Sequence, residues 1–243
     1  MLKNCIAVIG QGAAPFREAL ARLCADVLVL PPCPGMDPRV ASHPDMLMTV
    51  IGQNVILPGA YACREDVSPL LDILHRRCGC RMVCADLTPG DTYPADAAYN
   101  SLSFGTTLYG KLSSLSPDIL RIAAACGMDT ADVRQGYTGC SALSCGDILL
   151  TADPSIRDAV IARGGEVLFL TPGGIRLPGY NAGFIGGAGG YVSGNAVFFG
   201  DVRRHPDGAR ITQTLEKRGI RWHCLGDGPL TDFGGIKFFP HLA

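Results

Sequence analysis

The sequence is poor in charged residues and has no long apolar run. Charged side chains make up 18% of its 243 residues, and 21 Lys and Arg against 22 Asp and Glu leave a net charge of −1. Nonspecific nucleic-acid binding needs clustered positive charge, and a membrane-spanning helix needs about 18 or more consecutive apolar residues. Since the chain has neither feature, we expect neither nucleic acid nor a membrane as its partner.

The start of the chain has no apolar stretch long enough for a secretion signal. The short apolar run at 6–10 indicates a first buried strand instead. We therefore expect a cytoplasmic protein. Eleven cysteines, an odd number, agree with free thiols in a reducing compartment. An alternative is zinc held by His75, Cys78, Cys80 and Cys84. Because their spacing matches no common zinc motif, we favour packed thiols and expect no cofactor.

Apolar residues, glycine and proline are abundant. Apolar residues make up 47% of the chain, and 31 Gly with 17 Pro predict many turns between short elements. No linker or composition shift divides the sequence. We therefore expect one domain over residues 1–243.

Helices and strands recur in a fixed order. Apolar residues at helical spacing predict helices over 16–24, 67–77, 117–126, 155–163 and 210–218, and a glycine follows four of them. A short apolar run follows each helix, and two further strand-like runs precede most of them. The predicted strands are 27–30, 47–51, 54–57, 81–85, 133–135, 166–170, 183–187, 196–200 and 221–225. The repeating unit is therefore strand, strand, helix, strand.

Sliding these units over one another aligns a polar or thiol residue in the turn before each first strand. The aligned residues are Asp45, Asn100, Cys140, Asn181 and Asp232. About five units fill the chain, and the strand at 6–10 completes the last one. The sequence therefore predicts a five-bladed, pseudo-symmetric α/β-propeller with the helices outside. The five turns should meet at one mouth of its axis.

The competing architecture is a doubly wound α/β sheet, in which single strands alternate with helices and a glycine fingerprint follows the first strand. Gly10 and Gly12 supply part of that fingerprint, but Pro15 stands where the third glycine belongs. The paired strands favour the five-bladed ring.

The repeat order resembles that of the pentein superfamily of guanidino-group-modifying enzymes, which includes amidinotransferases, arginine and agmatine deiminases and dimethylarginine hydrolases. Three short motifs carry the resemblance. Residues 44–46 are similar to the family's Pro-Asp turn, 146–149 to its Gly-Gly-Asp strand, and 234–237 to the run before its catalytic cysteine. The resemblance implies the pentein fold, and it implies that Asp45 holds a substrate guanidinium.

The motifs also depart from the family pattern. Phe238 stands where the resemblance places the catalytic cysteine, and no histidine lies near residues 180–182, where the family has His-x-Asp. The usual thiol–imidazole pair is therefore absent from its usual places, and the family's chemistry does not carry over directly. The chain most closely resembles a bacterial branch with this fold.

The predicted mouth of the ring combines carboxylates, amides, a thiol and an imidazole. Paired carboxylates suit a small planar cation such as guanidinium or amidinium, and an activated thiol attacks an amidine carbon. Our hypothesis makes Cys140 the nucleophile, His43 the general base, and Asp45 and Asp232 the cation clamps. Further candidate substrate-binding residues are Asn100, Asn181 and Tyr180.

Each of these residues also has a structural interpretation, as a turn cap, a packed thiol or a surface aromatic. Three functions therefore stay open. The first is a hydrolase or transferase that acts on the C–N bond of a guanidino or amidino compound in an axial pocket. The second is a non-catalytic ring that binds a ligand or a protein. The third is a metal-dependent enzyme built on the same Asp, His and Cys cluster.

Overall fold

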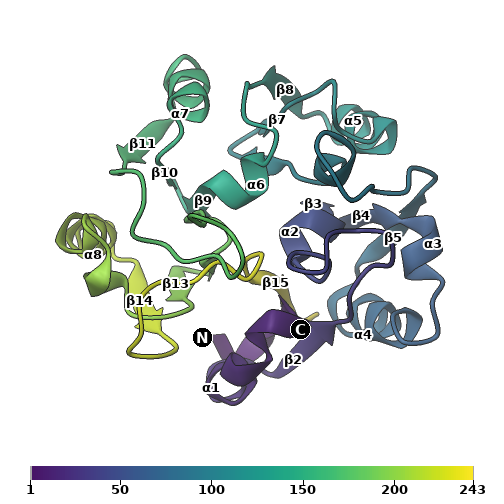
Figure 1. Ribbon diagram of the computed structural model, residues 1–243, viewed down its shortest axis with the longest axis horizontal. Coiled ribbons are helices and arrows are strands. Elements are labelled where there is room, and N and C mark those ends of the chain that lie inside the picture. The colour runs from purple at the N-terminus through teal and green to yellow at the C-terminus, as the bar shows by residue number, and fades with distance from the viewer. Residues whose placement is uncertain (1, 243) are drawn as a thin grey trace.

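The computed structural model describes residues 2–242, whose strands form five separate three-stranded sheets (Figure 1). In each sheet the middle strand pairs antiparallel with one neighbour and parallel with the other. A helical segment connects the middle strand to its parallel partner. The predicted repeat of strand, strand, helix, strand is confirmed.

Four repeats follow one another along the chain. The first holds β3 (Thr49–Ile51), β4 (Asn54–Pro58), α3 (Gly59–Ala62), α4 (Ser68–Cys78) and β5 (Arg81–Ala85). The second holds β6 (Leu102–Phe104), β7 (Thr107–Gly110), α5 (Pro117–Ala125) and β8 (Asp129–Asp132). The third holds β9 (Ala142–Cys145), β10 (Ile148–Thr151), α7 (Pro154–Ile161) and β11 (Glu166–Phe169). The fourth holds β12 (Gly189–Val192), β13 (Asn195–Phe198), α8 (Gly208–Lys217) and β14 (Arg221–Cys224).

The fifth repeat joins the two ends of the chain. Strand β15 (Lys237–Pro240) pairs antiparallel with β1 (Cys5–Gly10), which pairs in parallel with β2 (Asp26–Leu30). The connection between β1 and β2 is a 3-10 helix (Gln11–Phe16) and α1 (Arg17–Ala21). Figure 1 shows the purple N-terminal and yellow C-terminal segments together on one side of the ring. The expected completion of the last repeat by the first strand is confirmed.

The five predicted helices are present, with bounds that differ by a few residues. The four glycines expected after helices, Gly79, Gly127, Gly164 and Gly219, all have left-handed φ angles between 67° and 76°. None of the helices described in the structure is long and apolar enough to cross a membrane.

Two predicted strands were wrong. The strand expected at 133–135 lies earlier, at β8, where three of four side chains are exposed and no apolar run marks it. The strand expected at 183–187 is a loop that precedes β12. Glycine is needed at position 187 so that the loop backbone can pass close to the Asp232 side chain, because a Cβ at this position would lie 1.9 Å from Asp232 Oδ1. The hairpin expected in this glycine-rich run joins β12 and β13 through Ser193 and Gly194, both with positive φ.

Five hydrophobic clusters hold the ring together, and each one lies between two neighbouring repeats. For example, Ile51 and Ile56 of the first repeat pack in one cluster with Leu108 and Ile119 of the second. The middle strands β1, β4, β7, β10 and β13 are buried along their whole lengths. A single repeat therefore buries its apolar faces only when both neighbours are in place.

Hydrogen bonds join the turns at the centre of the ring. We call the segments before the five first strands, 43–48, 96–101, 137–141, 184–188 and 232–236, the hub turns. Hydrogen bonds link each hub turn to the next around the whole ring, with donor–acceptor distances of 2.6 to 3.1 Å. The first hub turn is linked to the second through Thr49, which follows it at the start of β3 and whose Oγ1 donates to the Tyr99 carbonyl. The other links run from the Gly139 amide to Asn100 Oδ1, from the Gly187 amide to the Cys140 carbonyl, from the Phe233 amide to the Gly187 carbonyl, and from the Asp45 amide to the Gly234 carbonyl.

The closing strand should carry much of the fold's stability. Phe239 on β15 is 3% exposed and packs in the cluster between the fifth and first repeats. We expect Phe239→Ala to lower the free energy of unfolding by about 3–5 kcal/mol, because it leaves a cavity at the closure. Ile161→Ala, at a 55% exposed position on α7, should change it by less than about 1 kcal/mol. Denaturant unfolding measures both, and equal effects would contradict closure as a main source of stability.

Asn100 should be a structural link between the second and third repeats. It is fully buried, and its Oδ1 accepts from the amides of Gly139 and Cys140 at 2.6 and 3.2 Å. We expect Asn100→Ala to cost about 2–4 kcal/mol, because two buried N–H groups lose their acceptor. Asn4→Ala, at an exposed position, is the control. Unfolding curves that overlay for the two variants would argue against this role.

Candidate functional site

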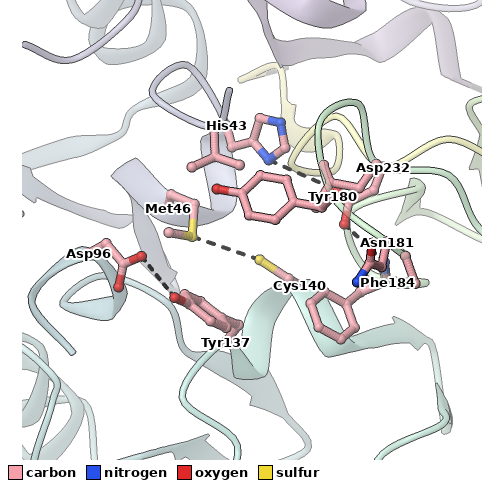
Figure 2. Close-up of a pocket in the computed structure, with 12 residues that line it drawn as sticks. His43, Met46, Asp96, Tyr137, Cys140, Tyr180, Asn181, Phe184 and Asp232 are labelled. Atoms are coloured by element: carbon pink, nitrogen blue, oxygen red, sulfur yellow. Dashed lines mark hydrogen bonds and ion pairs between the residues drawn. The ribbon is translucent and has the colours of Figure 1, made fainter. Parts of the chain in front are cut away.

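A cavity of about 330 Å³ opens at the hub, and all five hub turns contribute to its wall (Figure 2). His43 and Met46 come from the first turn, Asp96 from the second, and Cys140 from the third. Phe184 comes from the fourth hub turn and Asp232 from the fifth. The remaining lining residues are Val40, Tyr137, Leu177, Tyr180, Asn181 and Ala182. The ring therefore gathers side chains that lie far apart in the sequence.

Asp45 does not line this cavity itself, but it lies close to three residues that do, His43, Cys140 and Asp232, and its carboxylate is unpaired. The residue belongs to the short helix α2 (Pro44–Leu47), and Pro44 at the first helical position starts that helix. The side chain is 2% exposed, and neither carboxylate oxygen has a hydrogen-bond partner in the described part of the chain, although the Cys140 thiol lies close to the carboxylate. A buried carboxylate without partners is strongly unfavourable. This arrangement is typical of a site that receives a cation.

Asp232 is the second carboxylate at the same end of the cavity. It is 1% exposed, its Oδ2 accepts from the Phe184 amide at 2.9 Å, and its Oδ1 accepts from the Gly234 amide at 3.0 Å. Burial, together with the negative charge of Asp45, raises the pKa of Asp232 to about 7, although the two amides oppose the shift. The negative charge of Asp45 therefore acts on Asp232 through a water-poor region and disfavours ionisation of Asp232.

His43 faces Asp232 across the cavity wall. Its Nδ1 lies 3.8 Å from Asp232 Oδ1, and its side chain is nearly buried. Burial lowers the pKa of His43, and the charge of Asp45 only partly offsets this. The imidazole is therefore neutral near pH 7, the form in which it accepts a proton. Among the described residues no hydrogen bond connects His43 to Cys140.

Cys140 lies in α6 (Thr138–Ser141) and points into the cavity (Figure 2). Asn100 Nδ2 donates to its Sγ at 2.9 Å, and the Met46 sulfur lies 3.9 Å from it. Burial, and then the charges of Asp45 and Asp232, raise the pKa of the Cys140 thiol well above its usual range. This thiol is therefore protonated near pH 7.

Asn181 and Tyr180 line the rim of the cavity and not its centre. Asn181 is exposed and lies eight residues before β12, whereas Asn100 and Cys140 lie two residues before their strands. The register expected for Asn181 was wrong, because a long loop replaces the short turn of the other repeats. Tyr180 is 42% exposed, its hydroxyl donates to Asp37, and the Arg39 guanidinium lies 4.1 Å from its ring centre.

Sequence reasoning missed Asp96 and Tyr137. Asp96 lies in a short 3-10 helix (Ala95–Ala97) and lines the cavity opposite Asp232 (Figure 2). Tyr137 donates from its hydroxyl to Asp96 Oδ2 at 2.8 Å. Each stands three or four residues before an aligned hub residue, Asp96 before Asn100 and Tyr137 before Cys140. Their position in the hub turns was the one signal that could have found them.

The remaining sequence motifs lie elsewhere. His75 Nδ1 hydrogen-bonds the Cys80 carbonyl and Cys78 Sγ contacts the Phe239 carbonyl. Within residues 2–242 no three or more His, Cys, Asp or Glu side chains are placed so that they could hold a metal ion together. Gly146 and Asp147, expected within a strand, form the turn between β9 and β10, and Asp147 pairs with Arg218 at the surface. These residues take no part in the cavity.

Solved structures of guanidino-modifying enzymes have the same fold. The DDAH of Pseudomonas aeruginosa, in complex with citrulline, aligns with a TM-score of 0.55 at 14% identity over 92% of both chains. A dimethylarginine dimethylaminohydrolase adduct with S-methyl-L-thiocitrulline aligns with a TM-score of 0.56 at 13% sequence identity over 92% of both chains. The inosamine-phosphate amidinotransferase of Streptomyces griseus aligns with a TM-score of 0.50 at 16% sequence identity, over 90% of this chain and 76% of the amidinotransferase. At these identities the likeness establishes the pentein fold alone.

Comparison by sequence gives a family but no relative of known activity. No curated protein matches the sequence. The model of one family, described as a family of unknown function (DUF6873), matches residues 8–237, nearly the whole chain. The chain therefore belongs to the DUF6873 family, and it has the pentein fold of the guanidino-modifying enzymes.

Proposed function

We propose that the protein binds a small molecule with a guanidinium or amidinium head group in the axial cavity. The observation that carries this proposal is the pair of buried carboxylates, Asp45 and Asp232, with no Lys or Arg among the lining residues of the cavity. A planar cation with several N–H donors would pair both carboxylates at once. Ligand binding would then remove the repulsion that raises the pKa of Asp232.

The chemical nature of the walls fits such a ligand. Met46, Leu177 and Phe184 offer apolar surface for a short carbon chain attached to the head group. Two structures with this fold hold citrulline or S-methyl-L-thiocitrulline, and another is an amidinotransferase by name. These relatives support a ligand of this kind and leave its identity to experiment.

We further propose that Cys140 acts on the C–N bond of this ligand. A bound cation beside the thiol would stabilise the thiolate, while neutral His43 accepts the thiol proton. The sulfur then adds to the amidine carbon, the C–N bond breaks, and the amine leaves with the proton from His43. Water, or a second amine in a transferase, adds to the amidino-thioether carbon and releases the cysteine.

A second candidate is binding without chemistry. The observations that favour it are the raised pKa of the Cys140 thiol and the pairing of His43 with Asp232 instead of Cys140. A protein that only senses or carries the cation needs the carboxylates but no activated nucleophile. Binding and turnover measurements on the same variants separate the two candidates.

Affinity for a permanently charged alkylguanidinium should rise with pH through about 7. Asp232, whose pKa burial raises to about 7, binds a cation in its ionised form, so protonation at lower pH weakens binding. We expect about a tenfold gain between pH 6 and pH 8 by calorimetry. Asp232→Asn should bind more weakly and lose this pH dependence.

The control for that experiment is Asp129→Asn, an exposed carboxylate on β8 outside the cavity. It should retain both the affinity and the pH dependence of the original chain. If no alkylguanidinium or amidinium binds at any pH, the proposed function is wrong.

Replacement of the thiol should separate binding from chemistry. We expect Cys140→Ala to abolish release of amine from a panel of guanidino and amidino compounds, with their affinity changed less than about threefold. Mass spectrometry of the original chain should detect an amidino adduct on Cys140, which the variant lacks. Equal turnover by the two proteins would remove Cys140 from the mechanism, and binding without turnover by either would favour the non-catalytic function.

A further inference from the structure

The axial cavity has a second acidic end. Figure 2 shows Asp96 on the side of the cavity away from His43 and Asp232, with Met46 and Cys140 between the two ends. Asp96 is 7% exposed, and its Oδ1 has no hydrogen-bond partner among the described residues, although the backbone amides of Asp96 and Ala97 lie near the carboxyl group. A ligand that reaches from one end to the other therefore meets carboxylates at both of its ends.

The partner of Asp96 leaves this second end open to a ligand. Tyr137 donates to Oδ2 at 2.8 Å and holds the carboxyl group in place, so that Oδ1 is the free acceptor. Burial raises the pKa of Asp96 and outweighs the hydrogen bond from Tyr137. The group resembles Asp45 in that a buried oxygen lacks a hydrogen-bond partner, and a donor on a ligand would offset the cost of burying that oxygen.

Positive charge is missing from the cavity wall. Its twelve lining residues include no Lys or Arg, and His43 is neutral near pH 7. The guanidinium of Arg39, which stacks on the rim residue Tyr180, is paired with Asp37 and donates to the Gly179 carbonyl. A ligand carboxylate would therefore enter a negatively charged cavity without a cation to receive it.

We propose, on the basis of the proposed function, that the ligand is a dication: a guanidinium or amidinium at the Asp45–Asp232 end and an ammonium group at Asp96, without a carboxylate. The class is that of guanidino- or amidino-alkylamines, as distinct from guanidino amino acids and guanidino acids. Asp96 is the residue that sets this preference, and Tyr137 positions it.

Calorimetry with three matched probe series tests this assignment. The probes are alkylguanidines, ω-guanidinoalkylamines and ω-guanidinoalkanoic acids over a range of linker lengths, with arginine as the amino-acid probe. We expect one linker length of the guanidinoalkylamines to bind about tenfold or more tightly than the alkylguanidine of equal length, because a charge-assisted hydrogen bond is added. The guanidinoalkanoic acid should bind more weakly than both.

Asp96→Asn should abolish the gain from the terminal amine and leave the affinity for alkylguanidine within about twofold. Tyr137→Phe should keep a reduced gain, because the carboxylate persists but loses the group that orients it. Asp129→Asn, on the surface, should keep the whole gain. Circular dichroism of each variant establishes that it is folded.

The outcomes separate the two proposals. If alkylguanidines bind but the terminal amine adds nothing, or the gain survives Asp96→Asn, the assignment of Asp96 is overturned and the proposed function stands. If guanidinoalkanoic acids or arginine bind best, Arg39 must exchange Asp37 for the ligand, and the assignment is also overturned. If none of the probes binds, the proposed function itself fails.

Discussion

The structure depends on one constraint, which is that no repeat can bury its own apolar surface. Each of the five hydrophobic clusters is shared by two neighbouring repeats, and the middle strands are buried along their whole lengths. The chain satisfies this constraint only when β15 pairs with β1 and completes the fifth sheet. Closure therefore brings the hub turns together, and the site is a geometric consequence of the core.

The hub turns serve two opposed purposes. Some of their polar groups hold the ring together, as Asn100 does when it accepts from the amides of the next turn. Others are buried without partners, as are both oxygens of Asp45 and one oxygen of Asp96. The first kind stabilises the fold, whereas the second destabilises it until a donor arrives. Equivalent positions in different repeats therefore differ: some make hydrogen bonds within the hub, and others hold a buried polar group that makes none.

Electrostatics in the cavity also explains why the Cys140 thiol is not activated by its surroundings in the protein. Burial and the nearby carboxylates oppose ionisation of Cys140, and burial and the charge of Asp45 oppose ionisation of Asp232. A bound cation reverses both effects, because it stabilises every negative charge around it. Ligand binding and any chemistry at Cys140 are therefore coupled through the same field.

The sequence by itself determined the repeat order, the five helices, the ring and most of the residues that meet at its centre. These follow from local periodicity and from alignment of the repeats, which are properties of neighbouring residues. Asp45, Cys140 and Asp232 converge as their alignment predicted, and His43 lies beside them. The strands at 133–135 and 183–187 were misplaced because exposed edge strands and closely packed glycines give no apolar signal.

Only the tertiary structure decided the character of the site. Three features depend on which side chains arrive from other repeats: Asp45 lacks a hydrogen-bond partner, Cys140 is protonated, and Asn181 lies at the rim of the cavity. The opposed position of Asp96 depends on them as well. Burial and charge at the hub are sums over five distant segments, and no single segment of the chain contains that information.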